Sequence, residues 1–359
     1  MRAAIHKASP KLISGRIVRW FGVNQRDLPW RRTHDPYAIW ISEIMLQQTQ
    51  VKTVIPYYER WMRELPTIAS FAAAKSQRVL KLWEGLGYYR RVRNAQEAAE
   101  LVVRDFGGHF PTKFDDVLAL PGIGRYTAGA ICSLAYNAAT PILDGNVIRV
   151  LCRVYAIGGN PRDKKVNARL WELAGELVAS AKDRSALNQG LMELGALICA
   201  PREPKCKACP LAATCAAREQ GRVEAFPMLN SPPPPTSRKF AAYIVRRDDH
   251  YLVRQRPAHQ VNGGLWEFPN AEGGHPSEFH ILDAEPVWRI RHSITRYRIL
   301  LEAFSARLAN GEAPAGARWR TLAQLDKLPL ASAHRKILEL VKSREAGDTA
   351  PCPRRLKAT

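Results

Sequence analysis

Hydrophobic positions in the first part of the chain recur with a helical period. Between residues 16 and 220, apolar side chains repeat at intervals of three and four residues, for example in 79–83, 117–120 and 187–197. Such spacing places the apolar side chains on one face of a helix. We therefore expect this region to consist of helices separated by short turns.

The pattern changes after a proline-rich run. Residues 231–236 contain four consecutive prolines, which cannot continue a helix or enter a central strand, so we expect a stiff linker there. Beyond it, short apolar runs at 240–245 and 251–253 flank a turn at Asp248–Asp249. This arrangement is typical of a β-hairpin.

Two domains of different class follow from these patterns. A further strand is expected at 299–304 and a closing helix at 334–341. The chain has 359 residues, enough for two separate cores. The predicted fold is therefore multidomain, with an all-α part followed by a smaller α+β part. The predicted divisions are a helical region at 1–230, a linker at 231–237, a second domain at 238–345 and a basic tail at 346–359.

The charge balance indicates a polyanionic partner. Lysine and arginine number 54 against 33 aspartates and glutamates, which gives a net charge of +21. Such an excess opposes compaction, and cationic side chains bind nucleic acid by neutralising phosphates. DNA or RNA is therefore the favoured partner, and a membrane surface is the weaker alternative.

Composition also bears on location. No run of about 18 apolar residues is present, which excludes a membrane-spanning helix, and residues 1–15 lack the apolar stretch of a secretory signal. Seven cysteines are too few, and odd in number, for a disulfide scaffold. We expect a cytoplasmic protein, in the bacterial cytosol and associated with the nucleoid, that acts as a monomer.

Four cysteines form the strongest local motif. They follow the pattern C-x6-C-x2-C-x5-C, interrupted by prolines, at Cys199, Cys206, Cys209 and Cys215. Four thiolates within one short loop are suited to zinc or to an iron–sulfur cluster, and the spacing alone does not separate the two. The alternatives are two disulfides, which a reducing compartment disfavours, and unrelated buried thiols.

A glutamate in an apolar helix is a candidate proton donor. Asp35–Pro36 predicts a helix start, and the residues around Glu43 on its face of that helix are Ile39, Trp40 and Leu46. An apolar environment raises the pKa of a carboxyl group and keeps it protonated near neutrality. The alternative is a buried glutamate paired with an arginine.

Asp144 is a candidate anion. It precedes Gly145 at the start of a predicted helix from Val147, where the helix dipole favours an ionised carboxylate. A simple helix cap is the alternative. If both assignments hold, Glu43 and Asp144 differ in pKa, as expected for an acid and its anionic partner.

Two further segments are suited to DNA. Gly122 and Gly124 permit a tight turn between helices, where backbone N–H groups can meet a phosphate; an ordinary helix–helix turn is the alternative. The segments 47–50 and 86–91 combine amide, aromatic and cationic side chains that can enter a duplex from which a base has been flipped. A polar helix end and a surface loop explain these two segments equally well.

Taken in order, these motifs resemble a known family. The segments are 28–31, 43–50, 85–89, the glycine turn at 120–126, 143–147 and the four cysteines, and they are similar to those of MutY-type adenine DNA glycosylases of the helix–hairpin–helix superfamily. The segment 264–269 is similar to part of that family's Nudix-like C-terminal domain. A catalytic Nudix hydrolase also needs a glutamate-rich R-E-x-x-E-E helix, which is missing here, so nucleotide hydrolysis is not expected.

The resemblance implies a specific activity. Such enzymes remove adenine mispaired with 8-oxoguanine or guanine from double-stranded DNA, in base excision repair. It implies that Glu43 protonates adenine at N7 and that Asp144 stabilises the oxocarbenium-like sugar. It also implies that Asn146 orients the aspartate and the sugar, and that Tyr126 is the active-site tyrosine near the catalytic acid. It also implies a [4Fe–4S] cluster held by the four cysteines in the loop 199–215.

Further roles are carried over by the same resemblance. It implies that four residues line the adenine pocket: Trp30, Arg31, Leu46 and Gln189. Gln48, Thr49 and Tyr88 match residues that hold the opposing 8-oxoguanine, and Gly122 and Gly124 lie in the matching phosphate-binding turn.

Two positions refine the expected chemistry. Endonuclease III-like relatives carry a lysine where this chain has Tyr126, and a phenol cannot form the Schiff base that cleaves the strand. A monofunctional glycosylase is therefore expected, rather than a glycosylase/lyase for oxidised pyrimidines or a non-enzymatic iron–sulfur module. The family's lesion-reading loop is replaced by Ile294–Thr295–Arg296, in which Thr295 keeps a hydroxyl for 8-oxoguanine. The preference for 8-oxoguanine over guanine stays open.

Overall fold

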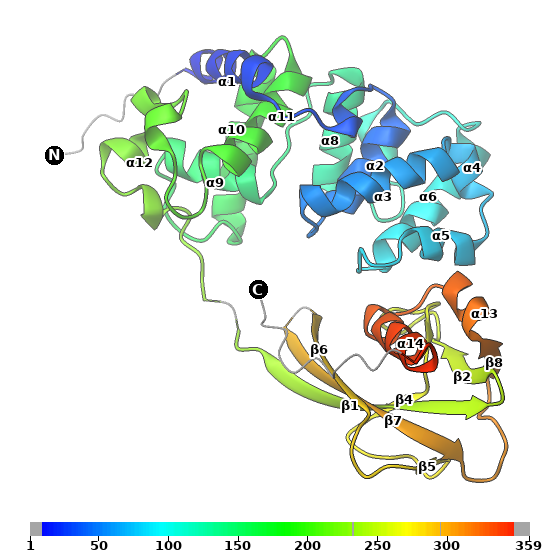
Figure 1. Cartoon of the computed structure of the whole chain (residues 1–359). Coiled ribbons are helices and arrows are strands. Elements are labelled where there is room, and N and C mark those ends of the chain that lie inside the picture. Colours follow the sequence, from blue (N-terminus) through cyan, green and yellow to red (C-terminus); the bar gives the residue numbers. More distant parts are fainter. Residues whose placement is uncertain (1–8, 232, 295, 348–359) are drawn as a thin grey trace. The chain divides into compact units, whose positions relative to one another are not determined.

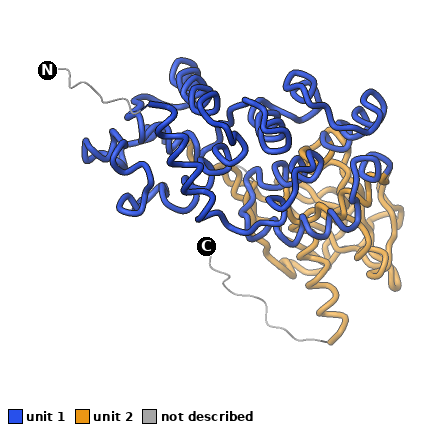
Figure 2. Tube along the Cα trace, turned by 90° about the horizontal axis from the view of Figure 1, so that it is seen from above, with its two compact units in different colours: residues 1–73, 94–231 blue, residues 74–93, 232–359 orange. Residues whose placement is uncertain are grey.

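The computed structural model covers the whole chain and describes residues 9–231, 233–294 and 296–347 (Figure 1). The chain divides into two compact units, coloured separately in Figure 2. Unit 1 comprises the described residues up to 73 together with 94–231, and unit 2 comprises 74–93 together with the described residues from 233 onward. The segment 74–93, which lies inside the predicted helical region, thus packs with the sheet-rich residues.

Unit 1 is entirely helical, apart from its connecting turns. Its α-helices are α1 (Pro10–Asn24), α2 (Pro36–Leu46), α3 (Val51–Glu64), α4 (Ile68–Ala72), most of α6 (Arg90–Asp105), α7 (Phe114–Leu118), α8 (Arg125–Tyr136), α9 (Gly145–Val154), α10 (Lys164–Ser180), α11 (Arg184–Leu197) and α12 (Ala216–Glu219). Short 3₁₀ turns lie at η1 (Pro29–Arg31), η2 (Cys206–Ala208), η3 (Ala212–Thr214) and η4 (Val223–Ala225). The predicted series of helices is confirmed.

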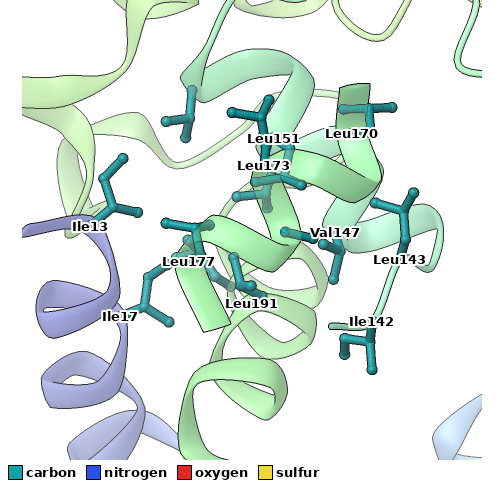
Figure 3. Close-up of a cluster of buried hydrophobic side chains, with 14 of the residues drawn as sticks. Ile13, Ile17, Ile142, Leu143, Val147, Leu151, Leu170, Leu173, Leu177 and Leu191 are labelled. Atoms are coloured by element: carbon teal, nitrogen blue, oxygen red, sulfur yellow. The ribbon is translucent and has the colours of Figure 1, made fainter. Parts of the chain in front are cut away.

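The core of unit 1 lies where α1, α9, α10 and α11 meet. Figure 3 shows its aliphatic side chains pointing toward one another, among them Ile17 of α1, Leu151 of α9, Leu177 of α10 and Leu191 of α11. Each of these side chains is at most 1% exposed. Burial of a leucine or isoleucine contributes about 1.5–3 kcal/mol to the free energy of unfolding, so this cluster stabilises the packing of α9 and α11 against α1 and α10.

Unit 2 is built on an eight-stranded sheet. Its strands are β1 (Thr236–Arg247), β2 (His250–Gln255), β3 (Trp266–Glu267), β4 (Asn270–Glu272), β5 (Phe279–Ile281), β6 (Trp288–Ile294), β7 (Tyr297–Leu308) and β8 (Ala317–Thr321). The main order is β3-β2-β1-β7-β5, with β4 on β1, β6 on β7 and β8 on β2. β1 and β7 run parallel over ten residue pairs, from Thr236↔Tyr297 to Val245↔Ala306.

Both faces of this sheet carry buried hydrophobic side chains. Alternate residues of β1 enter two cores, with Ala242 on one face and Tyr243 on the other, as the period of two along a strand requires. The first face packs against α14 (Ser332–Glu345) and α13 (Leu322–Lys327). The remaining helix of unit 2 is α5 (Ser76–Leu82), together with the first residues of α6.

The predicted elements of unit 2 are confirmed with longer bounds. The hairpin turns at Asp248, whose φ of 54° is left-handed, and its first strand already begins at Thr236 within the predicted linker. The predicted closing helix lies inside α14. Most of the predicted basic tail lies outside the described residues. None of the helices in the described part of the chain has both the length and the hydrophobicity that a membrane crossing needs.

Candidate active site

Glu43 lies on α2, whose start follows directly from the sequence. The Asp35 carboxylate caps the helix by accepting the N–H of Tyr37 at 3.0 Å, and Pro36 occupies the first turn. Glu43 is only 4% exposed. Because burial disfavours a charged carboxylate, the pKa of Glu43 is raised to about 7. The carboxyl group is therefore half protonated near neutral pH.

Tyr126, on α8, holds one oxygen of this carboxyl group. Its hydroxyl donates to Oε2 of Glu43 at 2.7 Å and lies 3.4 Å from the sulfur of Met192. This hydrogen bond lowers the pKa of Glu43, opposing the larger effect of burial. Burial and the nearby carboxyl groups raise the pKa of Tyr126 well above its ordinary value, so its hydroxyl stays a donor. The alternative, a buried glutamate paired with an arginine, is not found among the ion pairs of the described residues, and the prediction of a buried carboxyl with a raised pKa is supported.

Asp144 caps α9 in the predicted way. Its carboxylate accepts the Val147 N–H at 2.7 Å and the Asn146 amide at 2.9 Å. Both bonds favour the ionised form, while burial, the larger effect, raises the pKa of Asp144. The ionised state of Asp144 stays a prediction, which its two hydrogen bonds support and its burial opposes.

The two carboxyl groups interact with each other. The charge on Asp144 raises the pKa of Glu43, whereas the cation of Arg31 lowers it. Asp144 also raises the pKa of Tyr126. Glu43, Tyr126 and Asp144 thus form one electrostatically coupled group at which α2, α8 and α9 converge. Burial raises the pKa of both carboxyl groups, and that of Glu43 reaches about 7.

Asn146 connects Asp144 to the cysteine loop. Nη2 of Arg149 donates to Oδ1 of Asn146 at 2.9 Å, while its Nε donates to the Cys199 carbonyl at 2.7 Å. A line of hydrogen bonds therefore runs from the Asp144 carboxylate to the first cysteine. The sequence analysis missed Arg149; its position one helical turn after Asn146 was the available signal.

Arg31 and Gln189 meet beside a buried ion-pair network. Nε of Arg31 donates to Oε1 of Gln189 at 3.1 Å. Both Arg31 and Arg26 bind the carboxylate of Glu193, which is 1% exposed, and their hydrogen bonds lower its pKa to about 2 despite burial. The sequence analysis missed Glu193 because its partners lie more than 160 residues away along the chain. This network fixes the orientation of the Arg31 guanidinium.

The other two predicted pocket residues lie on neighbouring elements. Trp30, in η1, is 7% exposed and packs edge-on against Tyr58 at 5.4 Å between ring centroids. Leu46 is the last residue of α2, one turn beyond Glu43.

The glycine turn has the geometry that the sequence requires. Gly122 has a φ of 75°, and a Cβ atom there would lie 2.7 Å from Cβ of Asn94 on α6. Gly124 caps α8 without a side chain, so the first N–H groups of that helix point outward from its N-terminus.

The residues predicted to contact the opposing base lie on different segments. Gln48 and Thr49 follow the end of α2, where Gln48 adopts a φ of 58°. Tyr88 belongs to unit 2, and Thr295 lies outside the described residues.

The four cysteines surround a single cavity. Cys199, Cys206, Cys209 and Cys215 all line it, and every described cysteine is a free thiol, which removes the disulfide alternative for the loop. In the described part of the chain, no group of three or more His, Cys, Asp or Glu side chains has the geometry of a metal-ion site. The guanidinium of buried Arg153 donates to the Cys199 sulfur at 3.3 Å. Four thiols and two arginines, Arg153 and Arg218, around one cavity fit an iron–sulfur cluster in number and chemistry.

Comparison with known sequences identifies relatives of both units. The profile of the "HhH-GPD superfamily base excision DNA repair protein" family matches residues 41–176, and that of the NUDIX domain matches residues 240–340. The adenine DNA glycosylase of Rattus norvegicus is 35% identical, with 92% of this chain and 78% of the rat protein covered. That of Homo sapiens is 33% identical, with coverage of 95% and 78%, and that of Buchnera aphidicola subsp. Schizaphis graminum is 39% identical, with coverage of 71% and 73%.

Solved structures show the same helical fold. A thermostable thymine-DNA glycosylase is 33% identical, with a TM-score of 0.54, and covers 59% of this chain and 97% of its own. Endonuclease III in a non-covalent complex with DNA is 20% identical, with a TM-score of 0.50 and coverage of 60% and 98%. The second likeness concerns the fold alone.

Proposed function

Since this chain belongs to the adenine DNA glycosylase family of base excision repair enzymes, we propose that it removes adenine lying opposite 8-oxoguanine or guanine in double-stranded DNA. The observation that carries this proposal is the group formed by Glu43, Tyr126 and Asp144. A buried carboxyl with a pKa of about 7, held by a phenol and coupled to a second carboxylate, is suited to breaking a glycosidic bond.

Glu43 is the proposed general acid. Adenine is a poor leaving group as an anion, so a proton must reach it as the bond breaks. A carboxyl group that is half protonated at neutrality can deliver that proton to N7 and take one from water afterwards. Tyr126 occupies one oxygen of Glu43 and so leaves the other for the base. General acid catalysis of this kind contributes about 10²–10⁴ in rate.

Asp144 is the proposed stabiliser of the sugar cation. As the base leaves, positive charge develops on the sugar, and a carboxylate fixed by two hydrogen bonds stabilises that charge without having to reorganise. Asn146 acts as a positioning residue by donating to Oδ2 of Asp144. Water then adds to the sugar. Neither Glu43 nor Tyr126 provides an amine for a Schiff base, so we propose a monofunctional glycosylase.

The flipped adenine is proposed to enter a pocket formed by Trp30, Arg31, Leu46 and Gln189. Arg31 and Gln189 are already hydrogen-bonded to each other, so their remaining polar groups have fixed directions for a purine edge. The backbone turn at Gly122 and Gly124 is proposed to bind a phosphate, as helix N-termini do.

Cys199, Cys206, Cys209 and Cys215 are the proposed ligands of a [4Fe–4S] cluster. When bound, the cluster supplies folding energy to the loop rather than chemistry at the base. Arg153 supports that loop through the carbonyls of Cys199, Ala200 and Pro201. Gln48, Thr49, Tyr88 and Thr295 are the proposed contacts to the opposing base, as the resemblance implies.

A panel of defined duplexes tests this function. We expect cluster-replete protein to release free adenine from duplexes with adenine opposite 8-oxoguanine or guanine, but no thymine from a thymine opposite guanine. Glu43→Gln should lower the single-turnover rate by about 10²–10⁴ while duplex binding persists. Protein that releases no adenine from any of these duplexes contradicts the proposal, and an active Glu43→Gln variant contradicts the assignment of the acid.

A further inference from the structure

Helix α5, in the segment 74–93, is hydrogen-bonded to the sheet-rich part of unit 2. The amide of Gln77 on α5 donates to the Gly264 carbonyl at 3.2 Å, and the indole N–H of Trp266 donates back to Gln77 at 3.0 Å. Gly264 has a φ of 82°, and a Cβ atom there would lie 3.1 Å from a methyl group of Leu80. The segment 264–269, which resembles a Nudix signature, therefore binds helix α5 through hydrogen bonds and close packing.

A carboxylate completes this attachment. Glu84, in the turn after α5, accepts two hydrogen bonds from the Arg335 guanidinium, at 2.8 and 3.2 Å, and one from the Leu330 N–H at 3.1 Å. Lys81 adds an ion pair with Glu84 at 2.6 Å and donates to the Leu328 carbonyl at 3.2 Å. The side chains of Glu84 and Arg335 are 13% and 20% exposed. Ion pairs this sheltered from water are costly to break on one side.

The loop that follows carries an aromatic side chain in a strained position. Tyr88 is 42% exposed and adopts a φ of 47°, a left-handed conformation that non-glycine residues rarely occupy. Arg91 holds the loop by donating to the carbonyls of Leu86 and Gly87, both at 3.2 Å. Its guanidinium also lies over the Trp83 ring at 5.2 Å and the Tyr88 ring at 5.5 Å.

The hydrogen bonds of Glu84 and the strained conformation of Tyr88 are connected along the chain. A strained and exposed tyrosine needs rigid surroundings to stay in place, and the turn at Glu84 lies immediately before its loop. We propose that Glu84 and Arg335 are positioning residues. Their hydrogen bonds hold the loop that carries Tyr88 in the conformation that contacts DNA, so the Nudix-like part stabilises this contact. This inference rests on the proposed function only for the role of Tyr88 at DNA.

A matched pair of variants tests the positioning role. Glu84→Gln removes a carboxylate that binds Arg335 and Lys81, and Glu302→Gln removes one that is 10% exposed and binds Arg289 and Lys239 elsewhere in unit 2. We expect Glu84→Gln to speed amide hydrogen exchange at residues 85–92 by about tenfold in DNA-free protein, whereas Glu302→Gln leaves it unchanged. Equal exchange in both variants overturns the proposal, whatever the enzymatic activity.

A double-mutant cycle with Tyr88→Ala provides the functional readout. If Glu84 acts through Tyr88, Glu84→Gln slows adenine excision in the unmodified background by about tenfold but has no further effect when Tyr88 is already alanine. If the two substitutions together reduce the excision rate by the product of their separate effects, the proposal is overturned, since Glu84 then acts independently of the Tyr88 loop. Failure of the unmodified protein to release adenine contradicts the proposed function instead, and the exchange measurement then still decides this inference.

Discussion

At the scale of single residues, the protonation of Glu43 is set by two opposing effects. Burial raises its pKa to about 7, and the Tyr126 hydroxyl lowers it by donating to Oε2. If Glu43 is the acid, the excision rate falls as the pH rises through about 7, because only the protonated form can donate.

Tyr126→Phe should move that pH dependence. Without the phenol, the ionised form of Glu43 loses a hydrogen bond, so its pKa rises and the fall in single-turnover rate shifts to higher pH. Tyr136→Phe is the matched control: it removes a hydroxyl from the same helix that bonds the Phe110 carbonyl at 3.2 Å. An unchanged pH profile in Tyr126→Phe contradicts a role for Glu43 as the titrating acid.

The same raised pKa predicts a stability effect. The folded protein binds the Glu43 proton more tightly than the unfolded chain, whose pKa is 4.5, so this group's contribution to the free energy of unfolding decreases as the pH rises from about 4.5 to 7. Glu43→Gln has no carboxyl group to ionise at this position, so it does not undergo this decrease in the free energy of unfolding. Its stability relative to the unmodified protein should rise by up to about 3 kcal/mol between pH 5 and pH 8 in urea unfolding.

Glu302 supplies the contrast for that measurement. Its cationic partners lower its pKa, so its stabilising effect is present at neutral pH and is lost as the pH falls through its folded-state pKa. Glu302→Gln should therefore cost more stability at pH 7 than at pH 4, the opposite sign to Glu43→Gln. Parallel pH trends in the two variants contradict the raised pKa of Glu43.

Sequence reasoning reached the residues whose surroundings are local. The burial of Glu43 followed from its apolar neighbours on one helix, and the cap at Asp144 from the residues after it. Burial of Asp144, which raises its pKa against the effect of its cap hydrogen bonds, comes from tertiary packing and has no local signal. Glu193 was missed for the same reason, since its arginines lie far away in the sequence.

At the scale of elements, the two glycines of the helix-connecting turn make different demands. Gly122→Ala adds a Cβ atom 2.7 Å from Cβ of Asn94 at a left-handed φ, so it should cost about 1–3 kcal/mol of stability. Gly124→Ala meets nothing within 4 Å and keeps an ordinary φ of −97°, so its unfolding midpoint should stay close to that of the unmodified protein. Equal losses contradict the account of this turn.

Elements with strong local signals were predicted and their partners were not. The turn at Asp248–Asp249 and the capped start at Asp35–Pro36 lie where their sequences indicate. The grouping of 74–93 with the sheet-rich unit has no such signal, because α5 reads as one more amphipathic helix. Its partners, Trp266 and Arg335, come from the far end of the chain.

At the scale of the whole molecule, the cysteine loop links the fold to the site. Cys206→Ser removes one proposed cluster ligand, so the visible absorbance of the cluster should be lost and the loop 199–215 should become sensitive to protease. Excision should fall as well, because Arg149 connects the Cys199 carbonyl to Asn146. Cys132→Ala, at a buried cysteine away from the loop, should keep the absorbance. A colourless and fully active Cys206→Ser protein contradicts a structural cluster.

The attachment of α5 has a consequence for shortened gene products. A reading frame that stops before the prolines still encodes α5 but no longer encodes Gly264, Trp266 or Arg335. Leu80, which is 3% exposed in the intact chain, then meets water, and the carboxylate of Glu84 loses its main cationic partner. Nonsense and frameshift alleles that end the chain before these prolines therefore leave a fragment in which the apolar face of α5 is exposed, which makes the fragment prone to self-association and to degradation by cellular proteases.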